Sequence, residues 1–260
     1  MLRSGIPRAA SAEDGLTGIE PDNIRGILLD IEGTTTSISF VYDVLFPYAR
    51  QHVREFLQKH SGEERVHDEI AHLREQHAVD AKQQLNPPAL PEATAEIDAI
   101  VSYVCWLMDR DSKAGPLKSL QGMIWEEGYS QGDVKGHVFP DVRVAFERWR
   151  KAGIIIAIFS SGSVLAQKLL FGRTTAGDLT SFIKDYFDTT TGPKREAQSY
   201  RAIANALGVA PEQIVFVSDI TEELDAAAAA GMNTQLSVRP GNHPQPPSKH
   251  TIIHSFDELP

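Results

Sequence analysis

The sequence predicts an α/β protein: a doubly wound parallel sheet with an inserted helical module. Two observations carry this prediction. Short apolar runs alternate with helical patterns along most of the chain, whereas the stretch from 40 to 136 has no strong strand run and reads as helices alone. We therefore expect residues 21–39 and 137–260 to form the α/β core and residues 40–136 a helical cap. Residues 1–20 are expected to be a loose N-terminal extension.

The first expected strand is "IRGILLD" at 24–30, an apolar run that ends on an aspartate. Apolar residues without polar alternation are typical of a strand buried on both faces. Similar runs predict further strands over residues 153–160, 186–191, 213–219, 233–238 and 250–256.

Between these runs, apolar residues at helical spacing predict core helices over 141–151, 195–207 and 222–230. A glycine follows each of them, which is a common signal for the end of a helix. Strands that alternate with helices in this way imply that the sheet is parallel.

The inserted stretch contains three expected helices, at 40–57, 95–109 and 117–129, with a proline-rich break at 85–94. The insertion follows the first strand, so it lies beside the carboxyl end of that strand. Ligands of open α/β sheets bind at those ends. We therefore expect the helical insert to cover the functional site.

Charge and cysteine content restrict the function classes. Lys plus Arg is 25 and Asp plus Glu is 35, which gives a net charge of −10. An acidic chain without a basic block is a poor candidate for binding nucleic acid or an anionic membrane, and no apolar run approaches the roughly 20 residues of a membrane span. A single cysteine, Cys105, allows no internal disulfide and suits a reducing compartment. We expect a cytoplasmic protein, with the nucleus as a second candidate location.

Polar residues stand where the expected strands end. Asp30 ends the first strand, Ser160 and Ser161 end the second, and Asp219 ends the fourth. Because these ends meet at one edge of a parallel sheet, Asp30 and Asp219 would form an oxygen site suited to Mg²⁺. The serine turn can receive phosphate oxygens, and Lys194 after the third strand supplies a positive charge. The set predicts phosphoryl chemistry.

This order of residues resembles the haloacid dehalogenase superfamily of phosphatases. There, an aspartate at the end of the first strand attacks phosphorus, and an acid two places on protonates the leaving group and then activates water. Asp30 and Glu32 match these two positions, although most members carry Asp at the second. The backbone carbonyl of Glu32 is a further metal ligand in this reading. The remaining site positions are matched by the hydroxyl of Ser160, the ammonium of Lys194 and the metal-binding acids Asp219 and Glu223.

Six strings taken together resemble a narrower family, the enolase-phosphatases (acireductone synthases) of methionine salvage. They are "LLDIEGTT", "FVYDVLFPYAR", "IWEEGY", "SSGSVLAQKLLFG", "GPKREAQSY" and "SVRPGN", and the match covers roughly residues 24 to 257. Any one string is weak, but six in order are a specific signal. One departure is Pro193, which stands where relatives carry His and removes a backbone donor before Lys194.

The narrower resemblance implies a reaction and a set of ligands. The substrate would be 2,3-diketo-5-methylthiopentyl-1-phosphate, which is first enolised and then dephosphorylated to 1,2-dihydroxy-3-keto-5-methylthiopentene. The cofactor would be Mg²⁺, held at Asp30, Glu32, Asp219 and Glu223, with substrate contacts at Ser160, Ser161 and Lys194. Separately from the resemblance, we expect a monomer whose partner is this small phosphorylated diketone, and the acidic charge balance argues against nucleic acid and membrane as partners.

Other interpretations stay open at this point. Ser160 and Ser161 could cap a helix that begins near Val164, and Glu223 could be an acid favoured by a helix dipole. A general sugar-phosphate or nucleotide phosphatase would use the same fold. A phospho-acceptor receiver domain would be shorter, at about 100–150 residues, and a nicotinamide-binding domain would need a G-x-G-x-x-G motif that is missing here. The base for enolisation is either Glu32 or a residue of the cap.

Overall fold

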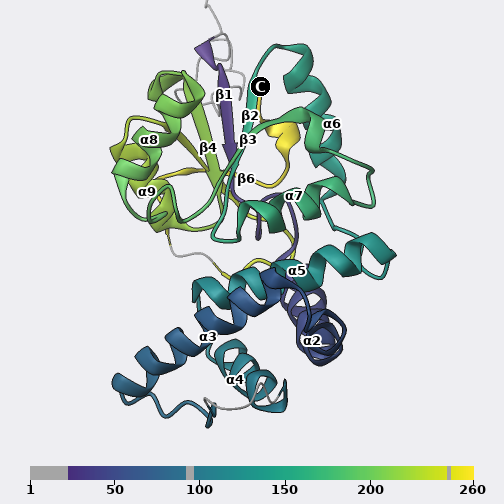
Figure 1. Ribbon diagram of the computed structural model, residues 1–260. Helices are drawn as coiled ribbons and strands as arrows, with labels where there is room; N and C mark the ends of the chain where they lie inside the picture. The colour runs from purple at the N-terminus through teal and green to yellow at the C-terminus, as the bar shows by residue number, and fades with distance from the viewer. Residues whose placement is uncertain (1–22, 92–96, 245–246) are drawn as a thin grey trace, which may run out of the picture.

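The computed structural model describes residues 23–91, 97–244 and 247–260 (Figure 1). The expected extension at 1–20 lies outside these residues. Within them, a six-stranded parallel sheet has the order β3-β2-β1-β4-β5-β6, which confirms the predicted fold class. The strands are β1 (Gly26–Leu29), β2 (Ile155–Phe159), β3 (Ile183–Phe187), β4 (Ile214–Ser218), β5 (Asn233–Ser237) and β6 (Thr251–Ile253).

Helices cover both faces of the sheet, as a doubly wound fold requires. On one side lie α6 (Pro140–Lys151) and α7 (Val164–Gly172), and on the other lie α8 (Ala197–Leu207) and α9 (Thr221–Ala229) (Figure 1). Successive residues of a strand point to opposite faces. Ile27 and Leu29 of β1 therefore belong to one apolar cluster, and Leu28 belongs to the other.

Two strand boundaries differ from the expectation. The third strand occupies Ile183–Phe187, whereas residues 188–191 form a turn in which Asp188 accepts a hydrogen bond from the backbone of Thr191 at 3.0 Å. This strand lies at the edge of the sheet, where polar side chains such as the exposed Lys184 and Asp185 are tolerated. Those charges interrupt the apolar run and hid the start of the strand. The last strand is also shorter than expected, and a 3₁₀ helix at Phe256–Glu258 follows it.

Between β1 and α6, the chain forms a separate group of helices at one end of the sheet (Figure 1). Its helices are the short α1 (Ile38–Phe40), a π-helical turn at Val41–Leu45, α2 (Phe46–His60), α3 (Glu64–Lys82), α4 (Ile97–Asp109) and α5 (Gly115–Gln131). The sequence pattern did not predict α3. Its buried side chains are only Val66, Leu73 and Asp80, so its apolar stripe is too thin to detect. The division into a core and a 40–136 cap remains our proposal.

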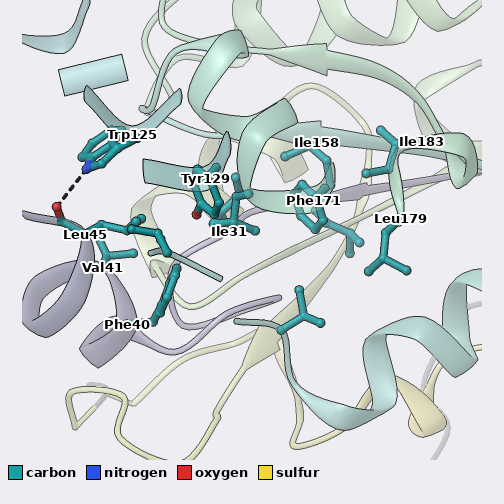
Figure 2. Packing of buried hydrophobic residues seen from close by; sticks show 14 of the residues in the cluster. Ile31, Phe40, Val41, Leu45, Trp125, Tyr129, Ile158, Phe171, Leu179 and Ile183 are labelled. Carbon is teal, nitrogen blue, oxygen red and sulfur yellow. Dashed lines mark hydrogen bonds between the residues drawn. The ribbon is translucent and has the colours of Figure 1, made fainter. Parts of the chain in front are cut away.

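The helical insert packs directly on the sheet domain. One apolar cluster runs without a break from Ile158 and Phe171 of the sheet domain to Tyr129 and Trp125 of α5 (Figure 2). The indole Nε1 of Trp125 donates to the carbonyl of Leu45 at 2.8 Å. That carbonyl lies at the end of the π-helical turn, where a wider turn leaves carbonyls available to side chains. No helix among the described residues is both long and apolar enough to cross a membrane.

The chain connects the sheet domain to the insert at residues 35–37 and returns at residues 137–139. These two connections are hydrogen-bonded to each other. His137 Nδ1 lies 2.9 Å from the Thr36 hydroxyl and accepts from the backbone N–H of Ser37 at 3.2 Å. The backbone N–H of Phe139 donates to the carbonyl of Thr35 at 3.0 Å. Burial lowers the pKa of His137, which keeps its ring neutral and able to accept these bonds.

Candidate active site

Asp30 is the first residue after β1, and its side chain is buried against a lysine. The residue is 5% exposed, and its backbone N–H continues the sheet ladder by donating to the carbonyl of Val217 at 2.9 Å. Lys194 Nζ lies 2.6 Å from Asp30 Oδ1 and 2.7 Å from Glu223 Oε2. The hydroxyl of Tyr200 donates to the backbone carbonyl of Lys194 at 2.7 Å and holds that loop in place.

Asp219 follows β4, the neighbour of β1, so the sheet order brings its carboxylate to the same edge as Asp30. Gly33 faces it with φ +68°, and a Cβ at this position would lie 2.4 Å from Asp219 Oδ2. Any side chain here would displace the carboxylate, so glycine is required by both space and backbone conformation. Glu223, in the first turn of α9, accepts from the Ser218 hydroxyl at 3.0 Å.

Two buried carboxylates, Asp30 and Glu223, therefore flank one ammonium, and the buried Asp219 lies near enough for the charges of both acids to act on it. Two causes raise the pKa of Asp219 to about 8 and that of Glu223 to about 7: burial is the larger, and repulsion from Asp30 is the next largest. Burial alone would lower the pKa of Lys194, but attraction to Asp30 and Glu223 outweighs it and raises that pKa. The excess of negative charge in a buried site favours the binding of a cation.

The chemistry of the donors fits Mg²⁺. Within residues 23–91, 97–244 and 247–260, no set of three or more His, Cys, Asp or Glu side chains is arranged to hold a metal ion. Mg²⁺ does not need such a set, because one or two carboxylates suffice when water and phosphate supply the other ligands. Asp30 and Asp219 provide two. Glu223 instead bonds Lys194 and Ser218 here, so its role as a metal ligand remains a prediction.

Glu32 lies two residues beyond Asp30, on the loop that leaves β1. Its side chain lines a cavity of about 290 Å³ between the insert and the sheet domain. Burial, and then the charge of Asp30, raises the pKa of Glu32 to about 6. A carboxyl with this pKa can both donate and accept a proton near neutral pH, which is the behaviour expected of a general acid and base.

Ser160 and Ser161 form the turn after β2 and line the same cavity. The Ser160 hydroxyl accepts from the backbone N–H of Gly162 at 3.2 Å. The cap of α7 is Ser163, which accepts from the backbone of Ala166 at 3.3 Å. Helix capping by Ser160 or Ser161 is therefore wrong as an interpretation, because α7 starts one residue after Ser163.

The segment "SVRPGN" at residues 237–242 hydrogen-bonds to the backbone of the loop at 31–36. The sequence pattern indicated no role for this segment. The Ser237 hydroxyl and Asn242 Nδ2 both donate to the carbonyl of Gly33, at 3.0 and 2.9 Å. Arg239 Nε donates to the carbonyl of Thr34 at 3.1 Å. These three residues fix the backbone beside Asp219, and only an unusual string of residues hinted at their importance.

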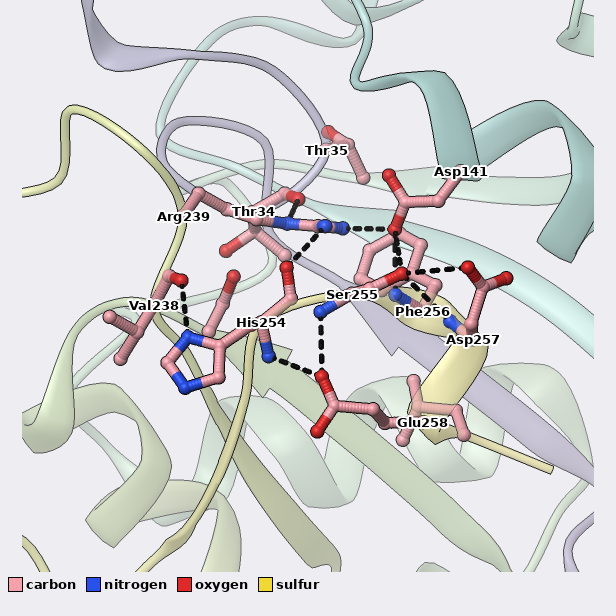
Figure 3. A network of polar contacts seen from close by, with 12 residues as sticks. Thr34, Thr35, Asp141, Val238, Arg239, His254, Ser255, Phe256, Asp257 and Glu258 are labelled. Carbon is pink, nitrogen blue, oxygen red and sulfur yellow. Dashed lines mark hydrogen bonds and ion pairs between the residues drawn. The ribbon is translucent and has the colours of Figure 1, made fainter.

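Arg239 is also the centre of a buried polar network (Figure 3). Its guanidinium pairs with Asp141 at 2.8 Å and donates to the carbonyl of His254 at 2.9 Å. It lies between two aromatic rings, 4.8 Å from the centroid of Phe139 and 4.5 Å from that of Phe256. The side chain is 4% exposed, so this arginine joins the C-terminal segment to α6 and to the loop of the site.

We predict that Arg239→Met lowers the free energy of unfolding by about 3–5 kcal/mol, because it leaves Asp141 charged and buried without its partner. Urea unfolding measures this loss. The matched control is Arg201→Met, which removes an exposed arginine bonded to the carbonyl of Ala229 and should cost less than about 1 kcal/mol. Equal losses in the two variants would contradict a structural role for the network.

The cavity beside the site is bounded by both parts of the molecule. Glu32, Ser160 and Ser161 line it from the sheet domain, and α5 supplies Trp125 and Tyr129. Most of the remaining wall is apolar, with Val41, Leu45, Phe46, Met108 and Leu117 among its residues. The arrangement places a charged edge next to an apolar chamber of the size that holds a small metabolite.

Comparisons with known proteins agree with this geometry. A family model described as haloacid dehalogenase-like hydrolase matches residues 24–231. The enolase-phosphatase E1 of Synechococcus elongatus is 54% identical over 239 residues, which is 92% of this chain and 99% of that protein. The enolase-phosphatase E1 of Pseudomonas syringae is 48% identical over 218 residues, covering 84% of this chain and 90% of that protein.

Solved structures show the same fold. UTR4 protein from Saccharomyces cerevisiae superposes with a TM-score of 0.74 at 35% identity, covering 91% of this chain and all of that one. A haloacid dehalogenase phosphatase from Thermococcus onnurineus has a TM-score of 0.53 at 18% identity and covers 90% of this chain and 95% of its own, which bears on the fold alone. The chain belongs to the haloacid dehalogenase-like hydrolase family and, within it, to the enolase-phosphatase E1 proteins.

Proposed function

We propose that the protein is an enolase-phosphatase that converts 2,3-diketo-5-methylthiopentyl-1-phosphate into 1,2-dihydroxy-3-keto-5-methylthiopentene and phosphate. The observation that carries the proposal is the position of Asp30. This buried carboxylate lies 2.6 Å from the Lys194 ammonium, at the edge where the neighbouring strand brings Asp219. Phosphoryl transfer requires a nucleophile, a fixed positive charge and hydrogen-bond donors to the phosphate oxygens. Ser160 and Ser161 are placed to supply these hydrogen bonds.

The proposed chemistry assigns a role to each residue. Asp30 Oδ attacks phosphorus and forms an aspartyl-phosphate while Glu32 protonates the leaving oxygen. Glu32 then removes a proton from the water that hydrolyses this intermediate. The Ser160 hydroxyl and the Ser161 turn hold phosphate oxygens, and Lys194 balances the charge of the transferred group. A pKa of about 6 for Glu32 suits this alternation between acid and base.

Mg²⁺ is the proposed cofactor, held by Asp30, Asp219 and the backbone carbonyl of Glu32, with Glu223 nearby. When bound, it would offset the repulsion between the nucleophile and the phosphate and stabilise charge on the transferring oxygens. Asp30 and Asp219 carry two buried carboxylates, and Lys194 supplies one positive charge beside Asp30. A bound cation would balance the remaining negative charge. This donor chemistry supports the assignment.

We predict that Mg²⁺ stabilises the protein more near pH 8 than near pH 6, since metal ligands must be deprotonated. The pKa of Asp219 is raised to about 8 and that of Glu223 to about 7, well above the values of unfolded carboxyls. In the metal-free protein these two groups therefore favour folding at low pH and lose that contribution as pH rises toward 8. Bound Mg²⁺ opposes the loss. Thermal unfolding with and without Mg²⁺ at both pH values measures the difference.

The matched control for this prediction is Asp219→Asn, which should greatly reduce the gain from Mg²⁺ at either pH. An exposed acid, Asp185, serves as the second control because its change to Asn should leave the gain intact. A gain that is larger at pH 6 than at pH 8 would contradict binding by these carboxylates.

The apolar part of the cavity wall, which includes Leu45, Phe46 and Met108, supports a substrate with a methylthioalkyl tail over a sugar phosphate, because it offers the tail a surface on which to be buried. The test is to incubate the diketo phosphate with the enzyme and Mg²⁺ and to follow enol absorbance and free phosphate together. The proposal requires enol formation followed by phosphate release. A panel in which sugar phosphates or nucleotides are hydrolysed faster than the diketo phosphate would favour a general phosphomonoesterase.

The partner and the location of the enzyme are also proposals. The partner is a small phosphorylated diketone, with no binding of nucleic acid or membranes, and the enzyme works as a monomer in the cytoplasm. The nucleus stays a prediction from the sequence.

A further inference from the structure

Lys118 is a cation of the helical insert that reaches the turn of the proposed phosphate site. It lies on α5 and is half-buried, and its Nζ donates to the backbone carbonyl of Ser161 at 3.0 Å and to the Thr189 hydroxyl at 3.4 Å. Ser161 and Thr189 belong to the sheet domain. The ammonium therefore bridges the two parts of the molecule at the rim of the cavity that it lines together with Glu32.

Lys118 forms no direct ion pair among the described residues. In the part of the chain that the structure describes, no carboxylate lies within ion-pair distance of its Nζ, and both groups that it contacts are uncharged oxygens. Burial and the ammonium of Lys113 lower the pKa of Lys118, and Asp188 acts in the opposite direction. A half-buried ammonium beside an apolar chamber is costly unless a ligand supplies the missing negative charge.

Lys118 also shares one face of α5 with the other residues that line the cavity. Gln121, Trp125 and Tyr129 follow at intervals of three and four residues, which places all four side chains on one stripe of the helix. The stripe has Lys118 beside Ser161 at one end, followed by the polar Gln121 and then by the aromatic rings of Trp125 and Tyr129. A ligand that lies along it would place an oxygen-rich end at Lys118 and an apolar end farther along the helix.

We propose that Lys118 is a catalytic residue of the enolisation step, binding the substrate carbonyl oxygen on which negative charge develops. This inference rests on the proposed function. In the step, a C1–H bond of the diketo phosphate breaks and its proton passes to the Glu32 carboxylate. The C–H electron pair forms the C1=C2 bond, and the carbonyl electron pair moves to oxygen. That oxygen is stabilised by the Lys118 ammonium and takes a proton from it, and the neutral amine recovers a proton from Glu32 through solvent.

The experiment compares wild type with Lys118→Gln and Lys118→Arg in two assays with Mg²⁺. One follows enol formation from the diketo phosphate, and the other follows hydrolysis of p-nitrophenyl phosphate, which needs phosphoryl transfer without enolisation. Lys118→Gln is expected to lower the ratio of the first activity to the second by about 10²-fold, the usual effect of one donor to a developing oxyanion. Lys118→Arg should restore part of the ratio because it keeps the charge. The control is Lys82→Gln, an exposed lysine at the end of α3.

The outcomes separate this inference from the proposed function. Equal losses in both assays for Lys118→Gln would overturn it, because they would indicate a phosphate contact or a misfolded site. An unchanged ratio would overturn it as well. Failure of the wild type to enolise the diketo phosphate, with p-nitrophenyl phosphate still hydrolysed, would instead reject the proposed substrate and this inference with it.

Discussion

Replacing Asp30 with Asn is expected to reduce phosphate release by roughly 10⁴-fold or more, because an amide cannot form the covalent intermediate. The fold should persist. Lys194 keeps its contact with Glu223 at 2.7 Å, and the loss of one buried negative charge relieves the repulsion that raises the pKa of Asp219 and of Glu223. The melting temperature without Mg²⁺ should therefore not fall. Assays of free phosphate and thermal unfolding measure both effects.

The same variant separates the two proposed reactions. Enolisation does not need the nucleophile, so the enol should accumulate in Asp30→Asn without release of phosphate. The exposed Asp185 provides a control of the same type, since its change to Asn should leave both activities near those of the wild type. Phosphate release by Asp30→Asn at close to the wild-type rate would refute a covalent role for Asp30.

The second large effect is expected for Lys194→Met. Loss of this ammonium removes the positive charge beside Asp30 and should slow phosphate release by roughly 10²–10³-fold or more. It also leaves Asp30 and Glu223 without their shared partner, at a cost of about 3–5 kcal/mol when both are ionised. The cost should depend on pH. Without the lysine, the pKa of Glu223 moves further above its unfolded value, so the loss of stability grows as pH rises through 7.

Urea unfolding of the metal-free protein near pH 6 and near pH 8 tests the pH dependence. The control is Lys184→Met, which removes an exposed lysine from β3 and should change the free energy of unfolding by less than about 1 kcal/mol at either pH. A loss for Lys194→Met that is the same at both pH values, or larger at the lower one, would show that the buried carboxylates are not what the lysine stabilises.

The sequence sufficed to predict the edge where the site is built. Apolar runs that end in Asp30, Ser160 and Asp219 are local signals, and a parallel sheet necessarily brings such ends together. The place of Lys194 after the third expected strand singled it out as a cation of the site, and the resemblance to a known family then gave Glu32 its expected role. The positions of these residues could be predicted without coordinates because each one depends on a short stretch of chain at a predictable place in the fold; their roles are proposals.

Contacts between distant segments could not be predicted in this way. Arg239 bonds Thr34, which lies 205 residues away in the sequence, and Lys118 reaches Ser161 from another part of the fold. Arg239 stands in the string "SVRPGN", which marks the family but says nothing of its contacts, and Lys118 has no local pattern that would distinguish it from a solvated cation. The missed α3 and the shifted start of β3 have a related cause: mostly exposed elements carry a weak apolar pattern, because little of their surface is buried.

The hydrogen-bonded connections at His137 have a mechanical consequence. Two independent tethers would let the inserted helices slide and twist as well as tilt. Here His137 joins the two connections through Thr36 and Ser37, and Phe139 joins them through Thr35, so we expect sliding and twisting of the inserted helices to be restricted more than tilting. Protonation of the His137 ring in acid would remove the two hydrogen bonds that Nδ1 accepts and leave the backbone bond from Phe139 to Thr35, so we expect the inserted helices to become less restricted in acid.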